Sequence, residues 1–294
     1  MEKEDKNIIE IETLVDAPVE QVWDYWTLSR HMIRWNAASP DWCTTCAEND
    51  LRPGGNFHAR MEARDGSFGF DFRGTYTNII KHKLIEYKLE DGRMVKIEFE
   101  PQHDQTHILE RFEPEQQNAL DLQKTGWQAI LDSFKRYAEK RKLSDLLVYD
   151  CEIKADHTKV FRALYDPELY RQWTVSFNPS SRYEGKWERG ATIRFLGEDH
   201  NGKTGGMISK IREHIPDKFI SIEHLGMVDA DREIMHGSEV DSWKGVLENY
   251  TLSHADGRTL LIVDLDPVDQ QSTNYFNDMW PKALHMLKSL CEKI

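Results

Sequence analysis

The sequence predicts an α+β protein of two tandem domains, each a curved antiparallel sheet wrapped around a long C-terminal helix, with two short helices after the first strand. Two internal matches predict the duplication. The stretch 15–35, VDAPVEQVWDYWTLSRHMIRW, aligns without a gap to 153–173, IKADHTKVFRALYDPELYRQW, 138 residues later. Near the end of each half the offset is 153, and there Thr106 matches Thr259 and Trp127 matches Trp280. A repeat of this length is typical of whole domains rather than of solenoid units.

The repeat also divides the chain. We place the first domain at 1–142 and the second at 143–294, joined by a short, charged linker near Glu139–Ser144. Domains of this length fit the usual size range. Residues that both halves share, such as Ala17 and Ala155, are most simply explained by the common scaffold. We therefore look for function among the residues that the halves do not share.

The composition is that of an acidic globular protein. Of the 294 residues, 39% are hydrophobic and 30% are charged, and the net charge is −13. The acidic excess divides evenly, with 26 acidic and 20 basic residues through Lys142 (−6), then 25 and 18 (−7). Neither half is basic, which argues against nucleic acid and anionic membranes as partners. The longest apolar runs have strand length, and the charged start MEKEDKNIIEIE lacks the apolar core of a secretory signal, so we expect a cytoplasmic protein.

The first half begins with a strand followed by two helices. Apolar side chains alternate from Ile9 to Val15, which predicts a half-buried strand. Pro18 then stands where a helix can begin. Alternating segments separated by glycine-rich or charged turns predict strands at 55–63, 67–79, 83–90, 93–100 and 105–112. A long amphipathic helix closes the half, with one apolar face formed by Leu120, Trp127, Ile130, Leu131, Phe134 and Ala138.

The second half repeats this plan. Its first strand alternates from Leu147 to Ile153, with Tyr149 and Cys151 on the same apolar side. Further strands are predicted near 191–198, 203–213, 218–226, 246–254 and 258–266, and a helix then runs to the C-terminus. An antiparallel sheet that curls around one long helix is a helix-grip arrangement, so the sequence predicts that arrangement twice.

Three motifs carry a resemblance to a known family. They are the opening VDAPVEQVW with Trp35, DLRPGGNF at Asp50–Phe57, and GWQAIL at Gly126–Leu131. Together they resemble the domain of the activator homologues of the heat-shock-protein-ninety ATPase, within the START/Bet v 1-like (SRPBCC) superfamily. The second half keeps the opening and the terminal helix, but has WERG at 187–190 for the Gly-Gly turn and Met279-Trp280 for Gly-Trp. The resemblance implies the fold and leaves function open, because the superfamily holds lipid carriers, hormone receptors, cyclases and co-chaperone parts.

Large side chains on the predicted strands suggest a cavity. The chain has 9 Trp, 10 Tyr and 12 Phe, and a concave sheet facing one helix needs large side chains to fill the space between them. These side chains either fill the core completely or leave room for an apolar ligand with a few polar anchors. In the first half the candidate lining residues are Phe57, Met61, Phe70, Phe72, Tyr76, Tyr87, Met94 and Trp127. In the second half they are Phe195, Met207, His224, Met235, Trp243, Tyr250 and Trp280.

Motifs for redox, metal or nucleotide chemistry are weak. Trp42-Cys43-Thr44-Thr45-Cys46 resembles a thioredoxin-type site, but it lacks a βαβ context and a second CxxC pair for zinc. These thiols are either incidental or reversibly oxidised, or they take a redox or metal role. The 12 histidines form no HExxH pair, and no GxSxG, P-loop or GxGxxG sequence occurs. We expect no metal and no cofactor.

Three classes of function remain open. The leading interpretation is non-enzymatic binding of a small hydrophobic or amphipathic ligand between the sheet and the C-terminal helix. The resemblance implies a second, a co-chaperone-like module that contacts a protein partner. The third is a cyclase- or hydrolase-type enzyme, which would need an acid or base in the cavity. Asp71, Glu98 and His224 lie on predicted strands and are the candidates for that role, but no catalytic residue is assigned.

Two differences between the halves bear on ligand access. The terminal helices carry helix-weakening residues beside the matched tryptophan, Gly126 in one and Pro281 in the other. A kink or break there would let the helix lift from the sheet and open the cavity. The second half also contains an acidic insertion from Met227 to Trp243, which we interpret as a lid over the second cavity rather than an inert loop.

Overall fold

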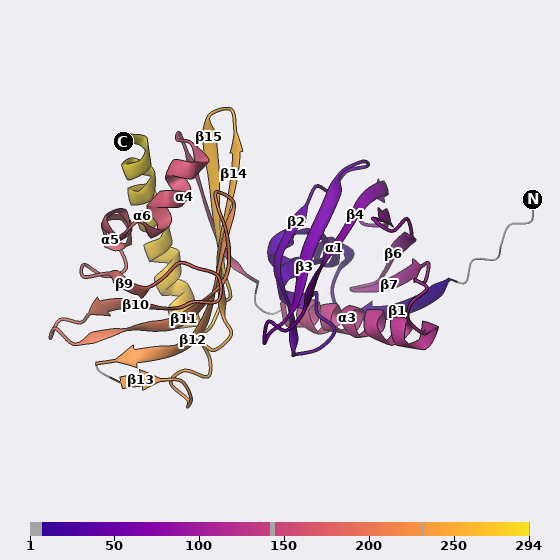
Figure 1. The fold of residues 1–294 in the computed structure, drawn as a ribbon, viewed down its shortest axis with the longest axis horizontal. Helices are drawn as coiled ribbons and strands as arrows, with labels where there is room; N and C mark the ends of the chain where they lie inside the picture. Colours follow the sequence, from indigo (N-terminus) through magenta and orange to yellow (C-terminus); the bar gives the residue numbers. More distant parts are fainter. Residues whose placement is uncertain (1–7, 142–144, 231, 294) are drawn as a thin grey trace, which may run out of the picture. The chain divides into compact units, whose positions relative to one another are not determined.

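The computed structural model describes residues 8–141, 145–230 and 232–293. The chain divides into two compact units, Met1–Ser144 and Asp145–Ile294, and each is described by itself (Figure 1). The predicted linker begins inside the last helix of the first unit, which continues to Arg141, and its residues 142–144 lie outside the described residues. The first seven residues of the charged N-terminal stretch lie outside them as well.

The first unit is the predicted α+β arrangement. A strand and two short helices are followed by six strands and one long helix. In chain order these elements are β1 (Ile9–Val15), α1 (Val19–Thr27), α2 (Ser29–Trp35), β2 (Trp42–Asn49), β3 (Asn56–Ala63), β4 (Gly69–Ile80), β5 (Leu84–Leu89), β6 (Met94–Gln102), β7 (Gln105–Phe112) and α3 (Leu120–Arg141).

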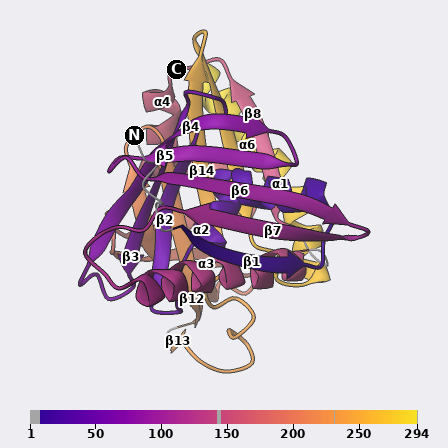
Figure 2. The ribbon, with the colours of Figure 1, turned by 90° about the vertical axis from the view of Figure 1, so that its right-hand side faces the viewer.

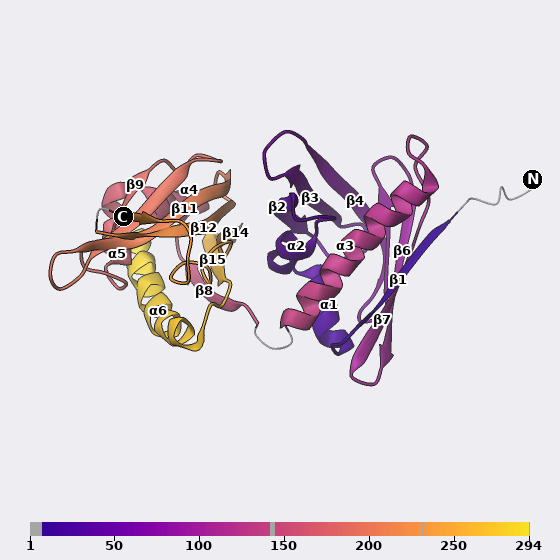
Figure 3. The same ribbon diagram turned by 90° about the horizontal axis from the view of Figure 1, so that it is seen from below.

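All strands of this unit form one antiparallel sheet. The strand order is β1-β7-β6-β5-β4-β3-β2, so the first strand pairs with the last. Figure 2 shows β4, β5, β6, β7 and β1 side by side in that order. The sheet curls, and α3 lies within the curl (Figure 3). Alternation along β7 turns Thr106, Ile108, Glu110 and Phe112 to the concave face.

The second unit has the same plan with one additional short strand, β13, and with a short strand, β9, at the sheet position of β2. Its elements are β8 (Leu147–Ile153), α4 (His157–Tyr165), α5 (Pro167–Thr174), β9 (Arg182–Gly185), β10 (Thr192–Glu198), β11 (Thr204–Ile215), β12 (Phe219–Asp229), β13 (Arg232–Ile234), β14 (Leu247–Ala255), β15 (Arg258–Leu265) and α6 (Gln270–Lys293). The sheet order is β8-β15-β14-β12-β11-β10-β9, and β13 pairs with β12. Both units are therefore helix-grip domains, as the repeat predicted.

Residues that the repeat matches make the same contacts in both units. Trp35 Nε1 donates to the carbonyl of Tyr25 at 2.9 Å, and the matching Trp173 donates to Ala163 at 3.1 Å. Both bonds join residues ten positions apart. Such indole donors are normally paired when buried. The shared tryptophans therefore hold the two short helices together, which is a scaffold role.

The matched threonines anchor the turn after the first strand. Thr106 Oγ1 donates to the carbonyl of Ala17 at 2.8 Å, and Thr259 Oγ1 donates to that of Ala155 at the same distance. Both threonine side chains are fully buried. The carbonyls that they pair would otherwise lack a partner, and a buried polar group without one is costly.

A further repeated contact escaped the sequence comparison. The carboxylate of Glu139 accepts from the backbone N–H of Asp16 at 3.1 Å, and Glu292 accepts from that of Lys154 at 2.9 Å. The two glutamates are 153 positions apart, the offset of the other C-terminal matches. Each bond joins the last turns of the long helix to the end of the first strand, so the duplication extends farther along the helix than predicted.

The structure corrects three predictions about the elements. Leu120 does not belong to the buried face of α3, because it is 46% exposed, whereas Leu131, Phe134 and Ala138 are buried. Strand β2 was missed because a bulge between Thr44 and Cys46 interrupts its alternation. Strands β9 and β13 were missed because they contain only four and three residues.

The two long helices run without a break through the positions expected to weaken them. Helix α3 includes Gly126, and α6 includes Pro281. The break that we considered as a way to open the cavity is therefore absent from both helices. None of the helices in the described part of the chain is long and apolar enough to cross a membrane.

Candidate functional site

The first unit contains a cavity of about 410 Å³ between its concave sheet and α3. The predicted residues Phe57, Met61, Phe70, Phe72, Tyr76, Tyr87 and Trp127 all lie on its wall. Met94 does not, because it stands on the edge of the hairpin and is 37% exposed. A cavity of this volume is typical of a small-molecule site. Whether its wall binds a ligand stays a prediction.

Ring contacts fix the aromatic wall. Trp127 of α3 stacks on Phe112 with 4.0 Å between centroids, and its edge meets Phe72 at 5.9 Å. On the facing strands Phe57 packs edge-on against Tyr87 at 4.8 Å. Such offset and perpendicular arrangements are the favourable ones for aromatic pairs. The wall is therefore preformed.

One acidic side chain lies inside this apolar cavity. Glu110 sits on the concave face of β7 between Ile108 and Phe112, is 5% exposed, and lines the cavity wall. Burial raises the pKa of its carboxyl to about 8. Throughout the described residues no hydrogen bond or ion pair reaches this carboxyl. Sequence analysis missed it, although an acid on the apolar side of an alternating strand was a visible signal.

Polar groups gather at one end of the first cavity. The cavity is lined there by Arg93, Glu115, Asn118 and Gln123. Gln123 holds the preceding loop in place, because its Nε2 donates to the carbonyls of Glu115 at 3.1 Å and Asn118 at 2.8 Å. Arg93 Nε lies 2.8 Å from a carboxylate oxygen of Asp91, so its charge is already paired. This end is polar but close to electrically balanced.

The second unit contains a larger cavity in the same place, of about 550 Å³. Its wall includes six predicted residues: Phe195, Met207, His224, Trp243, Tyr250 and Trp280. Met235 is not among the lining residues. Here too, ligand binding by the predicted residues stays a prediction.

A chain of polar groups crosses the wall of the second cavity. Ser209 Oγ lies 2.9 Å from His224 Nδ1, and His224 Nε2 lies 3.7 Å from a carboxylate oxygen of Glu248. The hydroxyl of Tyr250 donates to the other carboxylate oxygen. Burial, and then the charge of Glu248, hold the pKa of Tyr250 well above its usual value. Glu248 was not predicted as a site residue.

The polar groups of the two cavities occupy different positions of the same sheet. At the offset of 153, Glu248 and Tyr250 correspond to Val95 and Ile97, and Glu110 corresponds to Val263. The strand registers agree, because Ile97 faces Glu110 just as Tyr250 faces Val263. Each cavity thus has its own polar group at a position where the other has an aliphatic side chain.

Two of the three predicted acid–base candidates lie outside the cavities. Asp71 accepts from His58 on the outer face at 2.9 Å, and that bond lowers the pKa of its carboxyl. Glu98 is paired with Lys96 at 2.9 Å and with Arg111, and these cations lower its pKa as well. Both are ordinary surface ion pairs. Only His224 lies on a cavity wall.

The insertion of the second unit is not a lid as a whole. Its first part extends β12 and forms β13, and Met235 packs against Leu196, Ile208 and Val228 on the outer face of the sheet. Two of its residues line the cavity, Asp229 at the end of β12 and Trp243. The ring of Trp243 meets those of His224 at 6.3 Å and Phe276 at 6.0 Å. The segment therefore lies on both sides of the sheet.

All four cysteines lie among the described residues, and none of them forms a disulfide. Cys43 and Cys46 are buried on strand β2, so neither thiol lies at the helix N-terminus that activates thioredoxin-type sites. Cys291 is buried, and burial raises the pKa of its thiol to about 11. Cys151 is only partly buried, so the predicted core position holds for its packing but not for full burial.

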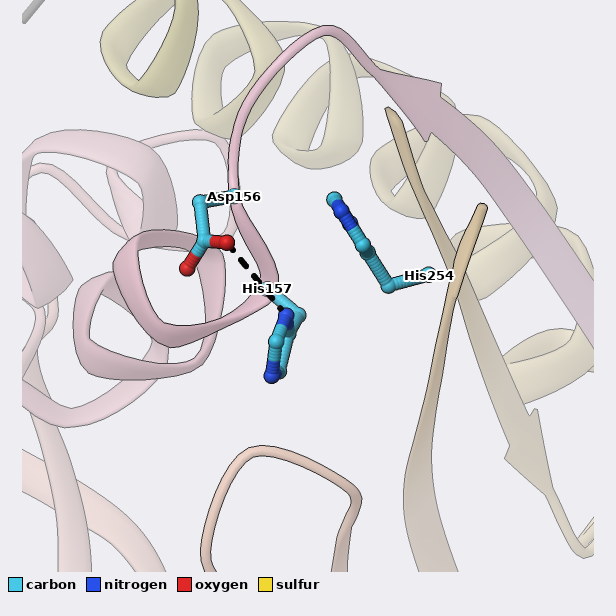
Figure 4. A group of neighbouring side chains, drawn as sticks. All are labelled: Asp156, His157 and His254. Atoms are coloured by element: carbon cyan, nitrogen blue, oxygen red, sulfur yellow. Dashed lines mark ion pairs between the residues drawn. The ribbon is translucent and has the colours of Figure 1, made fainter. Parts of the chain in front are cut away.

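Three side chains of the second unit meet where a metal ligand set is conceivable. Asp156, His157 and His254 each offer one ligand atom, and these atoms lie within 4.8 Å of one another (Figure 4). Asp156 and His157 come from the start of α4, and His254 from β14. The carboxylate already has a structural role, because it accepts from Thr158 N at 2.9 Å as the cap of α4. The rings of His157 and His254 lie 5.0 Å apart between centroids.

Solved structures of two kinds are similar to this chain. The AHSA1-like protein from Aeromonas hydrophila is 40% identical over 47% of this chain and 96% of its own, with a TM-score of 0.45. The di-domain ARO/CYC StfQ, from the steffimycin biosynthetic pathway, spans 97% of this chain and 98% of its own at 13% identity, with a TM-score of 0.54. The di-domain ARO/CYC BexL spans 97% and 99% at 11% identity, with a TM-score of 0.56. At such identities the di-domain likeness shows the fold alone.

Comparison with families agrees with the motifs. A search of curated proteins finds no match. The family model described as "Activator of Hsp90 ATPase homolog 1-like protein" matches two tandem segments, 16–139 and 154–292. These segments coincide with the two helix-grip domains. The resemblance seen in the opening, turn and helix motifs is thus confirmed, and the chain belongs to the family of Activator of Hsp90 ATPase homolog 1-like proteins.

Proposed function

We propose that this protein binds small hydrophobic or amphipathic molecules, without chemical conversion, in the cavities between each sheet and its long helix. The observation that carries the proposal is the pair of preformed cavities, of about 410 and 550 Å³, in which apolar atoms form the larger part of the wall surface. A ligand that buries about 200 Å² of apolar surface gains about 5 kcal/mol, which offsets much of the cost of association.

The two cavities favour ligands with different polar groups. The first offers the buried acid Glu110 and a nearly balanced polar end that includes Arg93 and Glu115. The second offers the connected groups of His224, Glu248 and Tyr250, which can both donate to and accept from a hydroxyl or carbonyl of a ligand. We therefore propose one ligand type for each unit rather than one shared ligand.

Blocking each cavity in turn tests the proposal. Met61→Trp places a large ring in the first cavity, and Met207→Trp does the same in the second. A neutral apolar naphthyl dye should bind the wild-type chain at two sites. Each variant should lose one site and keep the other, so that the untouched unit serves as the control for folding.

Native mass spectrometry of protein purified from its host supplies an independent readout. An apolar molecule should accompany the chain through purification. Absence of both a co-purified ligand and dye binding would refute the proposal. So would dye binding that neither variant changes, because the dye would then occupy neither cavity.

A co-chaperone-like role is the second candidate, and the description of the family favours it. Stimulation of a chaperone ATPase by the purified chain would support it, and this readout is independent of the cavities. An enzyme is the third candidate, because di-domain ARO/CYC proteins share the fold and His224 contacts Glu248 in the second cavity. Ligand turnover lost in Glu248→Gln but not in Glu98→Gln would support that candidate.

A further inference from the structure

We propose that the first cavity selects apolar ligands that carry a cationic nitrogen, with Glu110 as the counter-charge and the surrounding rings as an aromatic cage. The proposal rests on the proposed ligand-binding function and names the ligand class for one of the two sites. Glu110 lies on the cavity wall within a shell of apolar residues, and no partner reaches it in the described part of the chain.

The carboxyl of Glu110 has no hydrogen-bond partner in the described part of the chain, and a ligand could supply one. Buried polar side chains almost always have a hydrogen-bond partner, and each exception needs an explanation. The strand positions beside Glu110 supply none, because Ile97 faces it on β6 and Ile11 faces it on β1. The neighbours on the same face of its own strand are Ile108 and Phe112. The carboxyl is therefore open only towards the cavity.

The aromatic wall suits a cation. Trp127 stacks on Phe112, the next concave-face residue after Glu110, and Phe72 contacts Trp127 edge-on. Tyr87 lies within electrostatic reach, because the charge of Glu110 contributes to the raised pKa of its hydroxyl. A ring face attracts an ammonium or guanidinium group within about 6 Å, most strongly when water is excluded. A carboxylate beside such rings is a site for a hydrophobic amine or quaternary ammonium.

The other charged groups at this cavity do not reverse its preference for cationic over anionic ligands. Arg93 is the cation on the wall, and it is bound to Asp91 and donates to the carbonyl of Glu113 at 3.4 Å. Glu115 adds a second carboxylate at the same end. The first half of the chain has a net charge of −6, which attracts cations and repels anions at long range. An anionic ligand would bring a second carboxylate beside Glu110.

Binding of a permanent cation should depend on pH. In the unliganded cavity Glu110, with its pKa of about 8, holds a proton at neutral pH. A quaternary ammonium has no proton of its own, so its binding releases the proton of Glu110 to solvent. Its affinity should therefore rise about 50-fold between pH 6 and pH 8, following the ionised fraction, and level off above that.

Two probe ligands of the same shape separate the effect of the ligand's positive charge from that of its apolar surface. One is para-trimethylammonio-benzyl alcohol, and the other is para-tert-butyl-benzyl alcohol, which has the same shape and no charge. Calorimetry in an amine-free buffer gives the ratio of the two affinities for the full chain. The variants are Glu110→Gln and, as a matched control, Glu98→Gln, which changes a glutamate on the outer face of the neighbouring strand.

We expect Glu110→Gln to lower the ratio about tenfold and to abolish its dependence on pH. Glu98→Gln should leave both unchanged. A ratio that is the same in wild type and Glu110→Gln overturns the inference, as does tighter binding of para-hydroxymethyl-benzoate than of the ammonium probe. If one of these two results is found while the neutral probe still binds, only this inference fails and the proposed ligand-binding function stands. If no probe binds, the proposed ligand-binding function fails as well.

Discussion

Glu110→Gln should stabilise the unliganded first unit at neutral and alkaline pH. Burial raises the pKa of this carboxyl from 4.5 to about 8, so the folded state holds a proton that the unfolded state has released between these pH values. The folded state is therefore favoured most below pH 4.5, and this contribution is lost as the pH rises through 8. Each pH unit in this interval is worth about 1.4 kcal/mol.

The expected magnitude grows with pH. The cost of keeping Glu110 buried is under about 1 kcal/mol at pH 5, about 3 kcal/mol at pH 7 and about 4 kcal/mol at pH 8. Glutamine has nearly the same shape and no ionisation, so Glu110→Gln removes this cost. The gain in stability over wild type should follow the same values.

Hydrogen exchange on peptides from β7 measures this gain in the first unit alone, since the second unit can unfold separately. The buffer must contain no amine, because an amine is the class of ligand proposed for the cavity. Glu98→Gln, on the outer face, provides the control for loss of a glutamate. A gain that is equal at pH 5 and pH 8 would contradict the reasoning, because a solvated or paired carboxyl would give that result.

The other predictions concern scaffold positions. Thr106→Val and Thr259→Val should each lower the free energy of unfolding of their own unit by about 1–3 kcal/mol, because each leaves the buried carbonyl of Ala17 or Ala155 without its hydrogen bond. Hydrogen exchange would measure this loss, and a loss of only a few tenths of a kcal/mol would contradict the prediction. Gly126→Ala should raise the free energy of unfolding by about 0.5–1 kcal/mol, since a Cβ there meets nothing within 4 Å; urea denaturation checks it, and a loss would contradict it. Gly226→Val should detach the segment after β13, because a Cβ there would lie 2.5 Å from the carbonyl of Ile234; unchanged protease cleavage in that segment would contradict it.

The sequence predicted the scaffold because the scaffold leaves periodic signals. Alternation located the ends of most strands to within one to three residues. The match of Trp35 to Trp173 indicated the duplication, and in the structure both indoles donate equivalent hydrogen bonds. Strand β2 was missed because its bulge at Thr44 shifts the alternation by one residue. The insertion was misjudged because Met235 and Trp243 lie on opposite faces of one sheet. A segment that passes from one face of a sheet to the other leaves no periodic pattern in the sequence.

The site was predicted less completely than the scaffold. Aromatic residues on alternating strands indicated the walls, and thirteen of the fifteen predicted lining residues do line the two cavities, the exceptions being Met94 and Met235. The polar groups inside were mostly missed. Glu248 looks like any charged residue on a half-exposed strand, whereas Glu110 was overlooked although it stands among the apolar side chains of an alternating strand. Only the register shows that Glu110 faces Ile97 beneath α3 and that Glu248 lies beside Tyr250.

The buried carboxyl of Glu110 lowers the stability of the first unit, and the second unit indicates that this carboxyl serves function rather than folding. Val263 occupies the equivalent position in the second unit, so the fold does not require an acid there. An acid that costs about 3 kcal/mol at neutral pH and is not needed for folding is the kind of feature that function maintains against stability. A cationic ligand would remove that cost, because it supplies the partner that the carboxyl lacks. Glu110→Gln should accordingly give a more stable first unit that has lost its preference for the cation, and these two effects together distinguish a binding residue from a packing defect.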